Sequence, residues 1–132
     1  MELVSYLPDE AKKVRPGDRQ GPDKCRVRIR HNSWIAKIAC KCIKQKDVAL
    51  TLFRTIYLSH STPGVFLNNH RWVAHELAHV RQFRKYGNLN FVFMYLRESL
   101  LKGYYHNKWE VEARAEEEKP EILEEYYFEY AG

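Results

Sequence analysis

The chain has no long hydrophobic run and few cysteines, and each shortage excludes a class of protein. No stretch approaches the roughly 18 uncharged apolar residues that a membrane-spanning helix requires. The first ten residues show neither the basic start nor the apolar middle of a secretory signal peptide. The three cysteines are an odd number, which predicts free thiols in a reducing compartment rather than a disulfide framework. We therefore expect a cytoplasmic protein with no membrane span.

Zinc-finger and nucleic-acid-binding motifs are lacking as well. Cys40 and Cys42 could supply half of a metal site, but no second Cys or His pair follows at zinc-finger spacing. Free cysteines usually pack as small apolar side chains, so we expect these thiols to be buried or half-buried. None of the common nucleic-acid-binding motifs is present either.

Charge is distributed unevenly, although the net charge is only +5. Residues 110–132 hold nine Glu against Arg114 and Lys119, a balance of −7, so the other 109 residues carry 20 basic and 8 acidic side chains. A basic body can attract nucleic acid or an anionic membrane surface. We prefer a simpler interpretation, in which the acidic C-terminal segment folds back and neutralises the body. Nucleic acid is then a minor alternative partner.

The composition indicates one folded, soluble domain. Hydrophobic residues make up 45% of the chain and aromatic residues 14%, whereas 30% are charged. We predict a single domain over residues 1–132. It comprises a loop or arm over 1–24, a core over 25–118 and an acidic, aromatic C-terminal segment over 119–132.

Hydrophobic periodicity predicts the elements of the core. Alternation over residues 25–30 indicates a short strand, and a helical period from Ser33 indicates an amphipathic helix of about ten residues. Residues 47–59 are rich in β-branched and aromatic side chains, which indicates one long strand or two short strands bent near Arg54.

Three further helices are expected, over residues 70–86, over residues 89–102 and from about Lys108. The second is apolar on most sides, which predicts burial in the centre of the domain, with membrane or partner contact as the alternative. A last helical turn is expected after Pro120.

The most informative stretch is an H-E-x-x-H sequence, His75 to His79, in the middle of the helix expected over 70–86. Two histidines four residues apart project from one face of a helix, so both imidazoles can reach a single ion. Zn²⁺ accepts imidazole nitrogen and in catalytic sites keeps one position open for water. Glu76 lies where it can take a proton from that water.

The same helix has a second sector, formed by Val73, Leu77 and Val80, that we expect to face the core. The remaining side carries arginine and lysine, and we expect Ala74 and Ala78 to lie there, facing water.

A catalytic zinc site needs a third protein ligand. The metzincin continuation is excluded, because Gln82 and Lys85 stand where it requires Gly and His. A carboxylate from a later helix is the other solution, and Glu110 and Glu112 are the candidates. Two residues apart on a helix, they point about 200° from one another, so only one can face the metal.

These motifs resemble a known pattern. His75-Glu76-Leu77-Ala78-His79 followed by Glu110-Val111-Glu112-Ala113 resembles the gluzincin class of zinc metallopeptidases. Residues 47–118 are similar to small bacterial zincin-like domains of unassigned function, including the metallopeptidase-like core domain of extracellular contractile injection system proteins.

The resemblance implies that Glu110 is the third zinc ligand and Glu76 the general base. Gluzincins often carry an acidic or amide residue four positions after the ligand Glu, where it holds a metal-binding His. Arg114 stands at that position here and leaves the role unfilled.

A stabiliser for the reaction's oxyanion is expected just before the ligand helix, from Tyr104, Tyr105 or His106, with Tyr105 and His106 as the catalytic candidates. The sequence thus predicts an α+β zincin-like domain with a short sheet, an active-site helix, a buried helix after it and a Glu-bearing ligand helix. The expected function is zinc-dependent hydrolysis of a peptide or protein substrate. The alternatives are a non-catalytic zinc domain used for folding or partner binding, and a basic nucleic-acid-binding module.

Overall fold

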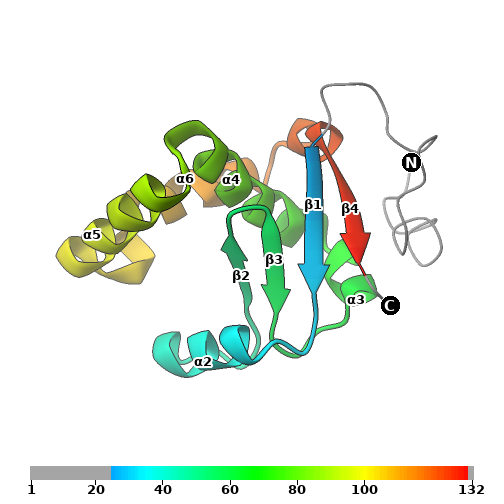
Figure 1. Cartoon of the computed structure of the whole chain (residues 1–132), viewed down its shortest axis with the longest axis horizontal. Helices are drawn as coiled ribbons and strands as arrows, with labels where there is room; N and C mark the ends of the chain where they lie inside the picture. Colours follow the sequence, from blue (N-terminus) through cyan, green and yellow to red (C-terminus); the bar gives the residue numbers. More distant parts are fainter. Residues whose placement is uncertain (1–24, 131–132) are drawn as a thin grey trace.

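A computed structural model describes residues 25–130 and shows a mixed α and β architecture (Figure 1). The arm expected over residues 1–24 lies outside the described residues, as do residues 131–132. Across the described part of the chain, no helix combines the length and apolar character needed to cross a membrane.

The sheet has four strands in the order β2-β3-β1-β4. Their bounds are β1 Cys25–Arg30, β2 Ala49–Leu52, β3 Thr55–Leu58 and β4 Tyr126–Tyr130. Strand β1 runs parallel to both neighbours, whereas β2 and β3 form an antiparallel hairpin. The expected strand over 25–30 is confirmed. The stretch 47–59 forms two strands that turn at Phe53 and Arg54, where Phe53 adopts a φ of 59°.

Helices begin where polar side chains can cap them. The helices are α2 Trp34–Ile43, α3 Pro63–Asn68, α4 His70–Tyr86, α5 Asn88–His106 and α6 Lys108–Glu116, followed by the 3₁₀ helix η2 Pro120–Glu125. The side chains of Ser33, Asn69 and Asn107 accept hydrogen bonds from the first turns of α2, α4 and α6. The predicted starts of α2, α4 and α6 are confirmed, whereas the short helix α3 was not expected.

Helix α4 connects the sheet to the other helices. Val73, Leu77 and Val80 are fully buried in the main core, as predicted. Ala74 and Ala78 are each only 2% exposed, so their expected place on the solvent side is wrong. The reason is that α6 and η2 pack on that side of α4, where small side chains allow a close approach.

Helix α5 is not buried, contrary to the prediction. Phe91 is its single buried residue, because α5 packs on α4 and α6 along one side and projects beyond the sheet (Figure 1). Within α5, Gly103 has a φ of 82° and interrupts the helical conformation before its last three residues.

The C-terminal segment also differs from expectation. A 3₁₀ helix follows Lys119, but the aromatic cluster after it forms strand β4 rather than a helical turn. Tyr126 and Phe128 are buried, because alternate side chains of a strand beside β1 face the core. Cys40 is buried and Cys25 is half-buried, whereas Cys42 is exposed, so the predicted burial fails for Cys42.

Candidate metal centre

Three potential ligand side chains meet between α4 and α6. His75 and His79 lie one helical turn apart on α4, with ring centroids 5.1 Å apart. The carboxylate of Glu110, in the first turn of α6, lies between them: Oε1 is 2.9 Å from His75 Nε2, and Oε2 is 3.1 Å from His79 Nε2. One ligand atom from each residue lies within 4.8 Å of the others, so the group could hold a metal ion.

The geometry separates the two candidate carboxylates. Glu110 is 3% exposed and faces both histidines. Glu112 is exposed and accepts a hydrogen bond of 2.8 Å from Gln82 Nε2 outside the cluster. Glu110 is therefore the carboxylate in position to be a third ligand. Cys40 and Cys42 belong to no such group within residues 25–130.

Each histidine is oriented by an acceptor on its outer nitrogen. His75 Nδ1 lies 2.8 Å from Glu117 Oε2, and His79 Nδ1 lies 2.8 Å from Gln82 Oε1. Gln82 also donates from Nε2 to the carbonyl oxygen of Trp109 at 3.1 Å, which fixes the direction of its amide. Acceptors at both Nδ1 atoms hold a proton there and leave Nε2, the nitrogen that faces Glu110, as the atom that could bind a metal ion once its own proton is displaced. Metal-binding histidines have this arrangement.

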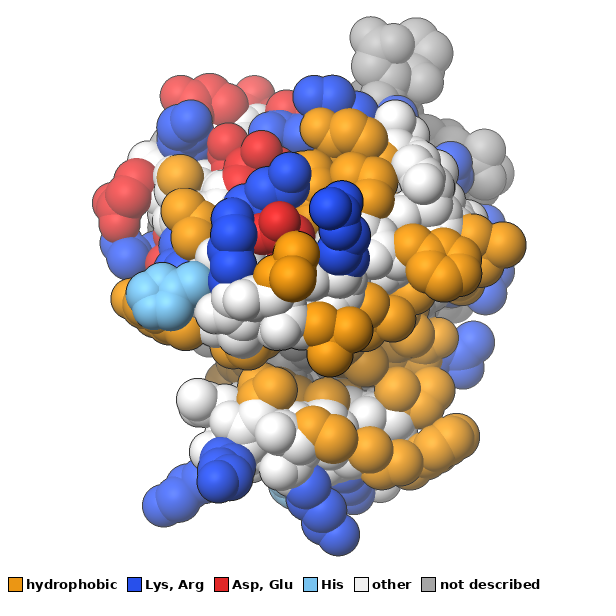
Figure 2. Space-filling view, turned by 90° about the vertical axis from the view of Figure 1, so that its left-hand side faces the viewer, with side chains coloured by type: hydrophobic (Ala, Val, Ile, Leu, Met, Phe, Trp, Pro, Cys, Tyr) orange, Lys and Arg blue, Asp and Glu red, His pale blue; other side chains and the backbone are white. Residues whose placement is uncertain are grey.

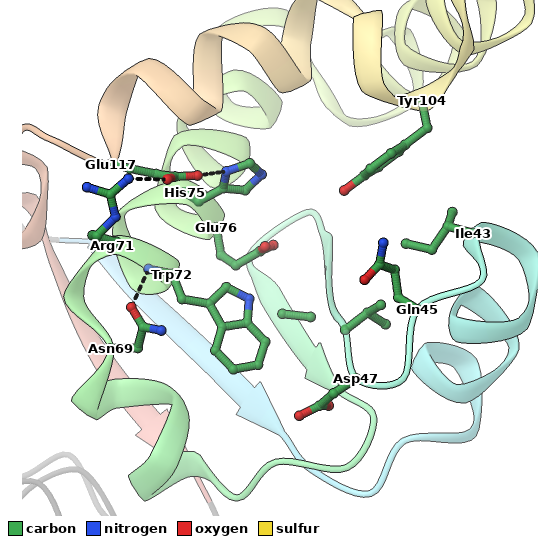
Figure 3. A pocket seen from close by; sticks show the side chains of 12 residues that line it. Ile43, Gln45, Asp47, Asn69, Arg71, Trp72, His75, Glu76, Tyr104 and Glu117 are labelled. Atoms are coloured by element: carbon green, nitrogen blue, oxygen red, sulfur yellow. Dashed lines mark hydrogen bonds and ion pairs between the residues drawn. The ribbon is translucent and has the colours of Figure 1, made fainter.

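Glu117 makes the contact with a histidine that the gluzincin resemblance led us to expect from position 114. It lies seven residues after Glu110, which returns it to nearly the same face of the helix after two turns. Arg71 lies 3.3 Å from Glu117 Oε1 and holds its carboxylate in place (Figure 3). Arg114 points elsewhere: it donates to the carbonyl oxygen of Tyr105 and lies 4.2 Å above the Tyr105 ring.

Tyr95 is a fourth member of the cluster, and the sequence did not reveal it. Its hydroxyl donates to Glu110 Oε2 at 2.5 Å from the facing side of α5. Burial, followed by the adjacent Glu110 carboxylate, raises the pKa of Tyr95, so the hydroxyl remains a donor. No spacing rule links position 95 to the motif, because the contact depends on how α5 packs against α6.

The electrostatics of the cluster favour a bound cation. Burial opposes ionisation of Glu110, but hydrogen bonds from His75 and His79 outweigh it and hold the pKa of this carboxyl well below its usual range. Burial alone would lower the pKa of His75, yet the hydrogen bond to Glu110 and the charges of Glu76 and Glu110 raise it to about 9. The negative charges of Glu110 and Glu76 thus stabilise a positive charge at this site, whether on an imidazolium or on a metal ion. Two imidazole nitrogens and a carboxylate oxygen are a donor set that suits Zn²⁺.

Glu76 lies beside the three ligand candidates without belonging to them. It is 5% exposed, and Thr51 Oγ1 donates to its Oε1 at 2.7 Å. Burial raises the pKa of Glu76, against the opposing effect of the two histidines. The strand residue Thr51 thus anchors one oxygen of a carboxylate that has an increased affinity for protons.

A cavity of about 390 Å³ opens in front of His75 and Glu76. Figure 3 shows Trp72 on one side and Tyr104 on the other, with the Tyr104 hydroxyl directed into the cavity. Ile43, Gln45 and Asp47, from the end of α2 and the segment after it, also line it.

Tyr105 and His106 are not brought to this cavity. Tyr105 is 64% exposed and lies under the Arg114 guanidinium, and His106 packs edge-on against the Tyr105 ring. The break at Gly103 accounts for the difference, because it changes the direction of the chain immediately before Tyr104. Of the three residues considered for oxyanion stabilisation, Tyr104 is the one that lines the pocket.

Comparison with known proteins adds no assignment: the sequence matches no family model, no curated protein and no solved structure. Inference about function therefore starts from the geometry of the site.

The two candidate carboxylates give a matched pair of variants. We expect Glu110→Gln to weaken zinc binding by about 100-fold or more, because an amide removes the negative charge between the two imidazoles. Glu112→Gln should change the affinity by less than about tenfold, since Glu112 reaches the site only through Gln82. Competition with a chromophoric zinc chelator measures both affinities. Equal affinities for the two variants would contradict the ligand assignment.

Metal binding should also release protons. With a pKa of about 9, His75 is protonated at neutral pH before an ion binds, and the ion must displace that proton. The affinity should rise by at least about tenfold per pH unit through the neutral range, because the pKa of His79 is raised as well, and should level off as the pH passes the pKa of His75. Calorimetric titration with zinc in two buffers of different ionisation enthalpy counts the protons. Identical heats in both buffers would be inconsistent with a protonated His75.

Proposed function

We propose that the chain is a zinc-dependent metallopeptidase that hydrolyses peptide bonds with metal-activated water. The observation that carries this proposal is the convergence of His75, His79 and Glu110 beside a buried carboxylate, Glu76, that is not one of the ligands. Zn²⁺ bound by the three residues would polarise a water molecule and the carbonyl of a substrate. Two further tasks, proton transfer and stabilisation of the negatively charged oxygen, would be carried out by protein side chains.

Glu76 is suited to move the proton. Thr51 holds one oxygen of its carboxylate, and the side chain points toward the pocket (Figure 3). Its raised pKa makes it a better proton acceptor than an exposed carboxylate. Glu76 takes a proton from the attacking water and then delivers it to the leaving amine.

Tyr104 is suited to stabilise the oxygen that becomes negative when the carbonyl is attacked. Burial, followed by the charges of Glu110 and Glu76, raises the pKa of Tyr104, so its hydroxyl stays protonated at neutral pH. A hydroxyl directed into a partly enclosed cavity can donate a hydrogen bond to that oxygen. Tyr104 takes this role in place of Tyr105 and His106.

The sheet favours a peptide as the substrate. Strand β2 is an edge strand that pairs with β3 on one side and with no other strand of the described chain. Ala49 of β2 lines the pocket, and Thr51 of the same strand holds Glu76. An extended peptide can add to such an edge through its main-chain hydrogen bonds, which would carry its backbone past Glu76.

The role of Glu76 is tested by Glu76→Gln. We expect this variant to bind zinc like the parent protein and to lose hydrolysis by about 10²–10⁴-fold, because the amide cannot accept the proton. A peptide library read by mass spectrometry reports cleavage, and metal analysis reports zinc. Glu121→Gln, at an exposed position on η2, is the matched control. If the zinc-loaded parent cleaves nothing and chelation by EDTA lowers its melting temperature, a non-catalytic zinc domain is the correct description.

The role of Tyr104 is tested by comparing Tyr104→Phe with Tyr105→Phe. Loss of the Tyr104 hydroxyl should lower kcat by about 10²–10³-fold with little change in KM, because the hydrogen bond forms mainly in the transition state. Tyr105→Phe should behave like the parent protein, since that side chain lies outside the cavity. A larger loss of kcat in Tyr105→Phe would reverse the assignment.

A further inference from the structure

Helix α5 presents an apolar face that no other part of the described chain covers. Leu89, Phe93, Leu96 and Leu100 follow one another at steps of four, three and four residues, which places them along one side of the helix. Their exposed fractions are 72%, 74%, 53% and 88%. Isolated exposed apolar side chains are common, but a continuous row of large ones marks a surface that is covered in use.

Helix α2 adds a second apolar surface at the same end of the molecule. Trp34 and Ile38, four residues apart, are 70% and 51% exposed. Ile43 at the end of α2 and Tyr104 near the end of α5 both line the pocket, so each helix borders the cavity at one of its ends. Figure 2 looks at this end of the molecule and shows apolar side chains on an upper and a lower lobe, with a recess between them.

Basic side chains accompany both surfaces. Helix α2 contains Lys37 and Lys41 and no acidic residue, and Lys44 follows at its C-terminal cap. Within residues 25–130, no carboxylate forms an ion pair with these three lysines. Helix α5 contributes Arg97 and Lys102, and its one carboxylate, Glu98, lies 3.4 Å from Lys102.

The acidic C-terminal segment does not neutralise this end. Five of the nine glutamates of residues 110–132 pair instead with arginines on α4 and β1: Glu117 and Glu118 with Arg71, Glu116 and Glu125 with Arg81, and Glu129 with Arg26 and Arg28. The expected folding back of the acidic segment therefore occurs, but it leaves the end formed by α2 and α5 basic.

We propose that the apolar and basic end formed by α2 and α5 binds the surface of an anionic lipid membrane. Exposed Trp, Phe and Leu can enter the boundary between lipid headgroups and acyl chains, while nearby Lys and Arg attract acidic headgroups. A second copy of the chain fits less well, because it would bring two lysine-bearing surfaces together. Nucleic acid would use the positive charge and would leave the leucines exposed. Membrane binding uses both features.

Cosedimentation of the full chain with vesicles tests the proposal. We expect binding to vesicles of phosphatidylcholine with phosphatidylserine, weak binding to pure phosphatidylcholine and a decrease of binding at high salt. Emission from Trp34 should shift to shorter wavelength on binding, and Trp34→Phe should remove that shift. The remaining emission comes from Trp109, which is 6% exposed, and from Trp72, which packs against the main core, so a shift that persists in Trp34→Phe would be assigned to these two residues.

Variants separate the two contributions. Leu100→Glu should lower vesicle affinity by about tenfold or more, because the row loses a large apolar side chain and gains a negative charge. Lys37→Gln and Lys41→Gln should each lower it roughly fivefold and leave the fold intact, since Lys41 is exposed and the half-buried Lys37 places its ammonium group at the surface, where it donates only to Asn32. Val65→Glu is the matched control: Val65 is 57% exposed on α3, away from the end formed by α2 and α5 (Figure 1).

Three results would overturn the proposal outright, and a fourth would reassign its lysines. They are no binding to acidic vesicles, an equal loss of binding in Val65→Glu, and a dimer in solution that Leu100→Glu converts to monomer, which would assign the face to a second copy. Competition by RNA without any Trp34 shift would assign the lysines to nucleic acid instead. The proposal is independent of hydrolysis, so Glu76→Gln should still bind vesicles after losing catalytic activity.

Discussion

The buried carboxylate of Glu110 is the constraint on which the arrangement of the helices depends. A charged group this far from water is tolerated only where other groups compensate for it, and here His75, His79 and Tyr95 do so from two other helices. The contacts therefore fix α4, α5 and α6 relative to one another. Apolar side chains would fill the same junction at lower cost, so cation binding explains the cluster better than stability does.

The structure around this carboxylate supplies both rigidity and direction. Three aromatic side chains, one from each of the three helices, pack next to the cluster: Phe83, Phe91 and Trp109. The ring centroid of Phe91 lies 4.7 Å from that of Phe83 and 5.4 Å from that of Trp109. Asn107 fixes the start of α6: its side chain donates to the carbonyl oxygen of Tyr95 and accepts from the amide of Trp109. Glu110 follows three residues later, so the cap that begins the helix also places the ligand.

The features that local rules govern could be predicted from the sequence, and those that depend on packing could not. The 3.6-residue period identified the helix over residues 70–86, which the structure caps at Asn69 and Gly87, and the motif placed both histidines on one face. Spacing left Glu110 and Glu112 as equal candidates, because it fixes the angle between them without showing which faces α4. The position of Tyr95 depends on packing between helices. Strand β4 did carry a signal, the alternation of Tyr126 and Phe128, which the glutamate-rich segment before it obscured.

Helix α5 was predicted to be buried because of its composition, and the reason that this prediction is wrong bears on its function. Its apolar residues are numerous enough to predict burial, but a helix that projects beyond the sheet has neighbours on one side only. That inner side presents Tyr95 to Glu110, while the outer side presents Leu100 and its row to solvent. At Gly103 a φ of 82°, strained for any other residue, redirects the chain so that Tyr104 enters the pocket. One helix therefore connects the exposed apolar row with both the Glu110 cluster, through Tyr95, and the cavity, through Tyr104.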